Sequence, residues 1–100
     1  MTPTDFVAQR DAGAPVLDVR TPKEFAEGHL AEAVNVNVMA PDFRDRIVEM
    51  DLPENGPVYL YCRSGNRSGT ATKILHEMGH AGAVNVGGLG ALAAAGAETA

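Results

Sequence analysis

The 100-residue chain has little of several residue types that mark large classes of proteins. It has one cysteine, so no internal disulfide can form and no disulfide framework fixes its compartment. It has no tryptophan and only 5% aromatic residues, which leaves no obvious stacking platform for single-stranded nucleic acid. No apolar run approaches the roughly 18 residues that a membrane-spanning helix needs.

Positive charge is also scarce: 8 Lys and Arg residues stand against 13 Asp and Glu residues, for a net charge of −5. Because no basic stripe accompanies this balance, we expect no nucleic-acid partner and no membrane partner. The N-terminal sequence MTPTDFVAQRDAG is acidic and mixed, unlike a secretory signal peptide. We therefore expect a cytoplasmic location, or a periplasmic one if a signal peptide has been removed.

The rest of the composition, with 45% hydrophobic and 21% charged residues, is that of an ordinary globular protein. Its length favours one domain over residues 1–100, with residues 93–100 as a frayed end. Short apolar runs alternate with helical patterns, and the expected strands are residues 16–19, 34–38, 58–61 and 83–86. This alternation predicts an α/β fold, with a mostly parallel sheet of four to five strands and helices on both faces.

Helical patterns connect these strands. Thr21 and Pro22 suit the first positions of a short helix that Gly28 ends, and a second helix is expected after Pro41. The clearest helix follows the cysteine, where apolar residues recur at i, i+3, i+4 and i+7. The expected core stripe of that helix is Ala71, Ile74, Leu75 and Met78.

The cysteine stands in the stretch VYLYCRSGNRSGTA, residues 58–71, between an expected strand and an expected helix. Open parallel sheets bind ligands beyond the carboxyl ends of their strands, and Cys62 stands at such an end. Gly65 and Gly69 allow the backbone to curl, so that successive N–H groups can form a concave anion site at the helix N-terminus. Arg63 and Arg67 add positive charge. These features stabilise a thiolate, which is a nucleophile and, where exposed, is readily oxidised.

The segment Cys62-Arg63-Ser64-Gly65-Asn66-Arg67-Ser68 closely resembles the active-site loop of rhodanese sulfurtransferases. The likeness covers most of the chain. In the N-terminal half it includes LDVRTP at residues 17–22, Glu24-Phe25, Gly28-His29 and AVNV at residues 33–36. In the C-terminal third it includes Met78-Gly79, VNV at residues 84–86 and Gly87-Gly88. The short form is most similar to the single-domain type represented by phage shock protein E.

The resemblance implies a three-layer rhodanese-like domain that acts as a thiosulfate sulfurtransferase and uses no cofactor and no metal. Cys62 would accept a sulfane sulfur from thiosulfate or a similar donor and hold it as a persulfide. It would then pass the sulfur to cyanide or to a thiol acceptor. The implied partners are small sulfur-containing anions, thiol acceptors and a sulfur-relay protein.

The resemblance also implies roles for the residues around Cys62. The substrate would be bound by five successive residues of the loop, through their backbone amides: Arg63, Ser64, Gly65, Asn66 and Arg67. Among these, Arg67 would brace the loop and Arg63 would contact an incoming sulfonate. Asp18 and Ser68 would support the loop through hydrogen bonds.

The chain departs from the family pattern in three places. The family often continues the Gly-His pair as I-P-G-A, where this chain has Leu30-Ala31-Glu32. The family often has a tryptophan shortly after the Gly-Gly pair, and residues 89–92 (LGAL) contain none. The N-terminal edge strand that is common in the family is not visible. We interpret Arg20 and His29 as residues that support the fold rather than as catalytic residues.

Three other interpretations of the cysteine loop were weighed. A free cysteine is often a small buried hydrophobe, but an anion-binding loop alone would not require a thiol. Cysteine phosphatases and arsenate reductases have five residues between cysteine and arginine, whereas four separate Cys62 from Arg67 here. The shorter loop favours a single sulfur over a tetrahedral phosphate, and a phosphatase also needs a general acid. A persulfide carrier or regulatory binding module shares the first half-reaction and stays open.

Two further motifs are interpreted as structural. His76-Glu77-Met78-Gly79-His80 matches the H-E-x-x-H zinc signature, which needs both histidines on one face of a continuing helix and a third ligand. Gly79 is expected to end the helix, which would turn His80 away. The glycines at 87 and 88 are interpreted as a turn before a last, weak helix.

Overall fold

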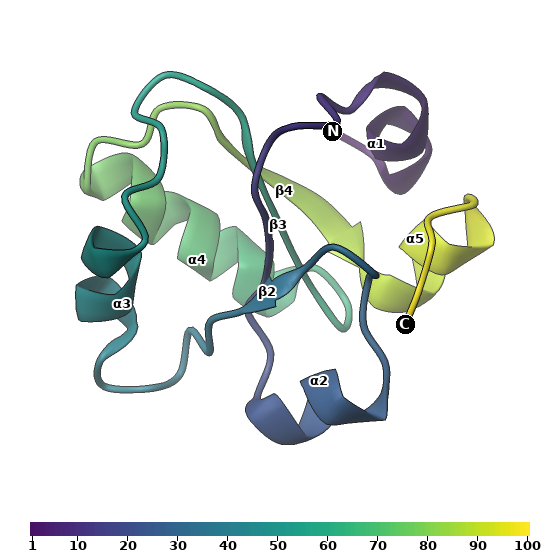
Figure 1. The fold of residues 1–100 in the computed structure, drawn as a ribbon, viewed down its shortest axis with the longest axis horizontal. Helices are drawn as coiled ribbons and strands as arrows, with labels where there is room; N and C mark the ends of the chain where they lie inside the picture. The colour runs from purple at the N-terminus through teal and green to yellow at the C-terminus, as the bar shows by residue number, and fades with distance from the viewer.

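The computed structural model describes residues 1–100 as a four-stranded parallel sheet between two layers of helices (Figure 1). The elements follow one another along the chain as α1 (Pro3–Gln9), β1 (Val16–Asp18), α2 (Pro22–Glu27), β2 (Val34–Asn35), α3 (Phe43–Glu49), β3 (Val58–Cys62), α4 (Asn66–Glu77), β4 (Ala83–Gly88) and α5 (Leu89–Ala94). Every strand pair is parallel. The predicted three-layer α/β fold is confirmed, with four strands.

Side chains on the two faces of β3 enter two separate cores. Val58 and Leu60 belong to a cluster of 12 buried residues that also includes residues of α3 and α4. Tyr59 and Tyr61 belong to a cluster of 7 that includes residues of α1 and α5. Figure 1 shows α3 and α4 on one side of the sheet and α1 and α5 on the other. Burial on both faces explains why β3 is a continuous apolar run.

The strand order β2-β1-β3-β4 places the carboxyl ends of β1 and β3 next to each other. From β1 the chain moves outward to β2, and from β3 it moves outward in the opposite direction to β4. Such a reversal is where open α/β sheets form the crevice that binds ligands. Asp18 ends β1 and Cys62 ends β3 at this edge.

Helices α1 and α2 begin with the same capping arrangement. In each, a threonine side chain accepts a hydrogen bond from the backbone N–H at the third helical position, and the acidic side chain there accepts one from the threonine N–H. The residues are Thr2 and Asp5 in α1 and Thr21 and Glu24 in α2. The predicted start of α2 is confirmed. Helix α1 was not predicted, because Phe6 is its only buried residue and creates no apolar periodicity.

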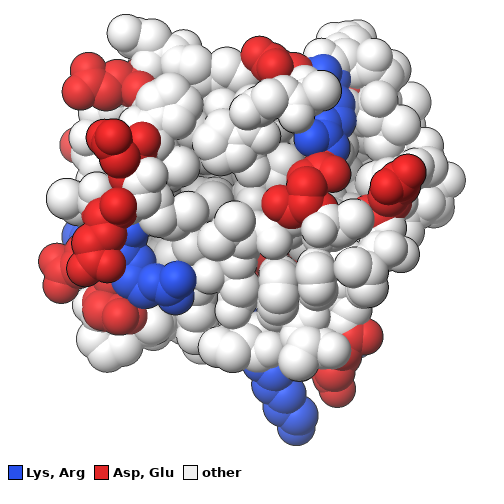
Figure 2. All heavy atoms as spheres, in the orientation of Figure 1, with Lys and Arg blue, Asp and Glu red and all other residues white.

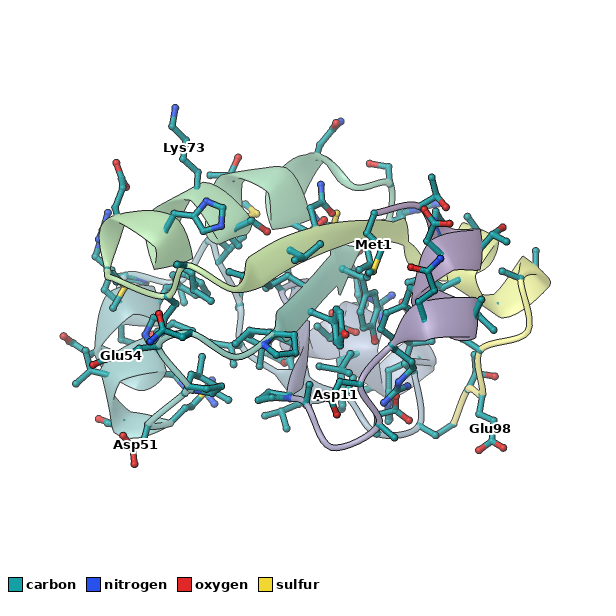
Figure 3. All side chains as sticks on the ribbon, turned by 90° about the horizontal axis from the view of Figure 1, so that it is seen from above. Met1, Asp11, Asp51, Glu54, Lys73 and Glu98 are labelled. Atoms are coloured by element: carbon teal, nitrogen blue, oxygen red, sulfur yellow. The ribbon has the colours of Figure 1, made fainter.

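Helix α4 has the predicted core stripe: Ala71 and Leu75 are buried, and Ile74 and Met78 pack partly buried against the same cluster. On its outer side Lys73 points away from the sheet (Figure 3). After Met78, Gly79 takes a φ of 97°, a left-handed conformation that glycine adopts without steric cost. Its N–H and that of the next residue bond to carbonyls of the last turn, so the predicted helix end is confirmed.

The C-terminal segment differs from the expected frayed end. Its residues pair with the segment that follows α2: the N–H of Ala100 donates to the carbonyl of His29 at 2.8 Å, and the N–H of Ala31 donates to the carbonyl of Glu98 at 3.0 Å. Leu30 and Thr99 form an antiparallel bridge. These backbone groups hold the segment in place, a pairing that the alanine-rich sequence AAAGAETA does not reveal.

Charged side chains are interspersed over the face drawn in Figure 2, which shows no continuous area of Lys and Arg. Across the outer surface, Arg44 of α3 and Glu77 of α4 form an exposed ion pair with an N–O distance of 3.4 Å. Exposed pairs of this kind contribute little to stability. None of the helices has both the length and the apolarity of a membrane span.

The core beneath α4 can be tested with Leu75→Ala. Leu75 has no exposed surface, so its truncation leaves a cavity and should lower the free energy of unfolding by about 2–5 kcal/mol. The matched control is Val48→Ala on α3, because Val48 is 70% exposed and should change stability by less than about 0.5 kcal/mol. Urea unfolding of both variants checks this, and equal effects would contradict the assigned core.

Candidate active site

Cys62 is the last residue of β3, and its side chain is completely buried. The loop that follows closes over the sulfur, so the condition of an exposed thiol, under which oxidation was expected, is not met. The N–H of Gly65 donates to Sγ at 3.0 Å, and the hydroxyl Oγ of Ser68 lies 3.4 Å from Sγ. Gly65 has a φ of 98°, the left-handed conformation that turns its N–H back toward the sulfur.

Two opposing effects act on the thiol of Cys62. Burial, the larger single effect, raises its pKa, because the charged thiolate is disfavoured away from water. Hydrogen bonds from the hydroxyl and N–H of Ser68 and from the N–H groups of Ser64 and Gly65 act in the other direction. Together these bonds outweigh burial, and the pKa of Cys62 is lowered below its ordinary value. The loop thus favours the nucleophilic form of the thiol.

Ser68 was expected to support the loop through hydrogen bonds, and its hydroxyl contacts a residue that sequence reasoning missed. Its Oγ lies 2.7 Å from Oδ1 of Asn85 on β4. A hydroxyl has one proton, so Ser68 can donate either to Asn85 or to a thiolate at Cys62. Asn85 also donates from Nδ2 to the carbonyl of Gly65 at 3.0 Å and accepts from the N–H of Gly87 at 3.1 Å. The available signal was an asparagine between two valines of a predicted strand, which the strand order places at the edge of the sheet as β4.

The end of β4 packs directly on the start of the loop. A Cβ atom added to Gly88 would lie 2.3 Å from the carbonyl oxygen of Arg63, so only glycine fits there. Gly87 takes a φ of 102° and lies against Gly65. The interpretation of this glycine pair as a turn before a helix was incomplete, because the pair also allows the backbone of β4 to approach the cysteine loop.

Arg67 braces the loop against α2. Its guanidinium forms two parallel hydrogen bonds with Glu24, Nη1–Oε1 at 2.7 Å and Nη2–Oε2 at 2.9 Å. Hydrogen bonding from Arg67 is the main reason that the pKa of Glu24 is lowered from 4.5 to about 2. Glu24 was quoted from the sequence but assigned no role. In the structure Glu24 has two roles: it caps α2, and it is the partner of Arg67.

Asp18 is fully buried, and its contacts differ from the expected bonds to the cysteine loop. Its carboxylate accepts hydrogen bonds from the hydroxyl of Tyr61 at 2.7 Å and from Nη2 of Arg20 at 2.7 Å. Burial raises the pKa of Tyr61, so its hydroxyl stays protonated and able to donate. Asp18 therefore holds the residue before Cys62 rather than those after it.

The remaining residues of the loop face solvent. Arg63, Ser64 and Asn66 are exposed. Arg63 lines a pocket of about 450 Å³ beside the loop, and the end of β1, helix α2 and the start of α5 form the rest of its wall. Arg20 is also part of that wall, so it is not scaffold alone.

The histidines all bond to nearby backbone. His29 stacks on Phe25 with ring centroids 3.8 Å apart. Nε2 of His76 lies 2.7 Å from the carbonyl oxygen of Ala83, and Nδ1 of His80 lies 3.1 Å from that of Pro53. These two histidines thus bond to different segments, and the chain contains no group of three or more His, Cys, Asp or Glu side chains placed to hold a metal ion.

Comparison with known proteins identifies similar chains. The family model of the rhodanese-like domain matches residues 2–95. The thiosulfate sulfurtransferase PspE of Escherichia coli is 36% identical over 73 residues, which cover 73% of this chain and 68% of that protein. The adenylyltransferase and sulfurtransferase UBA4 of Meyerozyma guilliermondii is 35% identical over 79 residues; the match covers 75% of this chain but only 19% of that protein.

A solved structure supports the same grouping. A rhodanese from E. coli, determined with anions, is 30% identical and superposes with a TM-score of 0.76. The match covers 88% of this chain and 98% of that one.

The support given by Ser68 can be tested through the ionisation of Cys62. Ser68→Ala removes one hydrogen bond to the sulfur, so the pKa of Cys62 should rise toward its ordinary value and less thiolate should be present at neutral pH. The ultraviolet absorbance of the thiolate, followed against pH, measures this without requiring access to the buried sulfur. Thr70→Ala is the control, because it removes an exposed hydroxyl of the same helix whose hydrogen bond goes to the carbonyl of Asn66 rather than to the sulfur. An unchanged titration in Ser68→Ala would refute the assigned bond.

The Glu24–Arg67 pair predicts an acid-dependent contribution to stability. Because the pKa of Glu24 is lowered on folding from 4.5 to about 2, its contribution is complete above pH 4.5 and is lost as the pH falls through 2. Glu24→Gln should therefore flatten the decline of unfolding free energy across this window. Urea unfolding at several pH values tests this, with Glu49→Gln on α3 as the control. If the free energy of unfolding fell equally with pH in wild type and in Glu24→Gln, the result would contradict the pairing of Glu24 with Arg67.

Proposed function

Because the chain belongs to the rhodanese family, we propose that it is a sulfurtransferase that carries a sulfane sulfur on Cys62. The observation that carries this proposal is the contact of loop hydrogen-bond donors with the sulfur: Gly65 N–H at 3.0 Å and Ser68 Oγ at 3.4 Å. Donors in this arrangement stabilise negative charge on sulfur, both in a thiolate and in a persulfide.

The first half-reaction loads the cysteine. The thiolate of Cys62 attacks the outer sulfur of thiosulfate, and a new S–S bond forms as the S–S bond of thiosulfate breaks. The electron pair of the broken bond leaves with sulfite, which thereby gains one negative charge, and the transferred sulfur keeps its own negative charge as the terminal sulfur of the persulfide. Charge and atoms balance without an oxidant. The loop amides that face Sγ support the charge on the sulfur in each state.

The second half-reaction removes the sulfane sulfur from Cys62. Cyanide, or the thiolate of an acceptor, attacks the terminal sulfur, and the electron pair of the Cys62 S–S bond returns to Sγ. The products are thiocyanate or an acceptor persulfide, together with the Cys62 thiolate. Because no leaving group needs a proton, this chemistry does not require a general acid.

The other loop residues receive roles that follow from their contacts. Arg63 is exposed and forms no ion pair, so its charge is available to the sulfonate end of an incoming donor. Arg67 is engaged with Glu24 and holds the loop in place, while its positive charge adds to the favourable field around Cys62. The amides of Ser64, Gly65 and Asn66 complete the binding loop, and Asp18 positions it through Tyr61.

A phosphatase activity is less consistent with these contacts. Two of the three carboxylates near the loop are occupied: Asp18 is buried against Arg20, and Glu24 is bonded through both oxygens to Arg67, while the third, Glu27, lines the pocket beside the loop. Neither Asp18 nor Glu24 is available as the general acid that a phosphate leaving group needs. The four-residue spacing between Cys62 and Arg67 points in the same direction.

A persulfide carrier is the second candidate function. It is favoured by the match to UBA4, where a similar sequence forms 19% of a larger adenylyltransferase and sulfurtransferase. A carrier would load Cys62 in the same way but pass the sulfur to a protein partner. Turnover with thiosulfate and cyanide as the only substrates separates the enzyme from the carrier. We place either role in the reducing cytoplasm, where a free thiol persists.

The proposed function predicts a sulfur adduct on Cys62. Intact mass spectrometry of the reduced protein after exposure to thiosulfate should show the addition of one sulfur atom, and cyanide should remove it. Cys62→Ser should show no adduct, because it removes the attacking atom. Native reduced protein that takes up no sulfur would refute the proposal.

A further inference from the structure

The pocket beside the cysteine loop is much larger than the proposed small substrates require. Its volume of about 450 Å³ lies within the range of small-molecule sites, whereas cyanide and thiosulfate occupy a small part of such a space. Cys62 itself does not line the pocket, but the next residue, Arg63, does. Arg63 therefore connects the pocket to the loop that closes over the sulfur, and the pocket has room for a larger molecule than either substrate.

Two of the four charged residues in the pocket wall, Glu24 and Arg20, already have ionic partners. Both oxygens of Glu24 bind Arg67, and Nε and Nη2 of Arg20 bind Asp18. Nη2 of Arg20 also donates to the carbonyl of Gly28 at 2.6 Å. These contacts leave the guanidinium of Arg20 with one nitrogen, Nη1, that has no hydrogen-bond partner. The side chain of Arg20 is only 7% exposed, so this free donor belongs to a nearly buried group in the pocket wall.

Three charged groups of the wall remain free to bind a ligand. Two are cationic, Nη1 of Arg20 and the whole guanidinium of Arg63. The third is the carboxylate of Glu27, the last residue of α2, which forms no ion pair. A ligand with only negative groups would leave Glu27 unpaired, and one with only a positive group would face two guanidinium groups. A ligand with both a carboxylate and an ammonium group satisfies all three.

We propose that this pocket selects the sulfur acceptor, and that the acceptor is a small zwitterionic thiol of the amino-acid type, such as cysteine. Its carboxylate binds Arg63 and Arg20, and its ammonium group binds Glu27. Guanidinium groups suit this role because they can donate two parallel hydrogen bonds to a carboxylate. The inference rests on the function proposed above, since it concerns the second half-reaction on Cys62.

The atoms and charges of the proposed transfer step balance. The terminal sulfur of the Cys62 persulfide takes a proton from solvent, the acceptor thiolate attacks that sulfur, and a new S–S bond forms as the bond to Sγ breaks. The electron pair of that bond returns to Sγ as the Cys62 thiolate, and the proton stays with the terminal sulfur in the acceptor persulfide. The sulfane sulfur changes its carrier, and no oxidant or reductant is consumed.

The test uses three thiols that differ only in the groups the pocket would bind. Wild-type protein is loaded with thiosulfate, freed of excess donor and mixed with L-cysteine, cysteamine or 3-mercaptopropionate at equal thiolate concentration. Loss of the sulfur adduct is followed by intact mass spectrometry. Because cysteamine has no carboxylate and 3-mercaptopropionate has no ammonium group, we expect cysteine to discharge the protein about three- to tenfold faster than either. Rates within about twofold of one another would overturn the proposal.

Variants assign the effect to the two charges. Glu27→Gln should lower the rates with cysteine and cysteamine about three- to tenfold relative to 3-mercaptopropionate. Arg63→Gln should lower the rates with cysteine and 3-mercaptopropionate relative to cysteamine. The matched control is Glu49→Gln, at an exposed helical glutamate outside the pocket, which should leave all three ratios unchanged.

The outcomes separate this inference from the function on which it rests. If the protein never takes up sulfur from thiosulfate, both proposals fall. If it loads and discharges but Glu27→Gln has the same acceptor ratios as Glu49→Gln, only the acceptor assignment falls. A shift in the cysteine and cysteamine rates in Glu27→Gln, together with the opposite pattern in Arg63→Gln, supports it.

Discussion

The buried carboxylate of Asp18 holds together the edge of the sheet at which the candidate active site is built. It accepts hydrogen bonds from Tyr61 and from both the backbone and the guanidinium of Arg20. Arg20 in turn binds the carbonyl of Gly28, and the hydroxyl of Tyr61 accepts from the N–H of Leu30. Because an unpaired buried charge is strongly destabilising, these groups must be arranged together. The network thereby fixes the positions of β1, β3 and the end of α2 relative to one another.

The loop around Cys62 is held from two sides by residues distant in the chain. Asn85 of β4 binds Ser68 and the carbonyl of Gly65, and Glu24 of α2 binds Arg67. The conformation of the loop therefore depends on these contacts as well as on its own sequence. Its backbone N–H groups stay free to face the sulfur, because side chains from other elements hold its carbonyl and its arginine.

The burial of Cys62 couples its chemistry to the folded loop. Burial by itself would disfavour the thiolate, and the donors of Ser64, Gly65 and Ser68 outweigh this effect. A loop that opened would lose these donors, so the reactive thiol exists only where the loop is closed around it. The pocket lined by Arg63 and Glu27 lies beside this closed loop rather than over the sulfur, which separates the binding of a large acceptor from the stabilisation of the sulfur.

The parallel α/β fold, helix α4 and the position of Cys62 at the end of a strand could be predicted from the sequence, because these depend on local periodicity and on the alternation of strands and helices along the chain. The prediction that Ser68 supports the loop came from the family resemblance. The sequence did not reveal α1, the pairing of residues 98–100, or the parts that Asn85 and Glu24 take in holding the loop. Each of these depends on a contact between segments far apart in the chain, which no local pattern encodes. The burial of the thiol and the unpaired charges of the pocket became visible only in the folded chain. Both follow from the partners that the fold brings within hydrogen-bond distance.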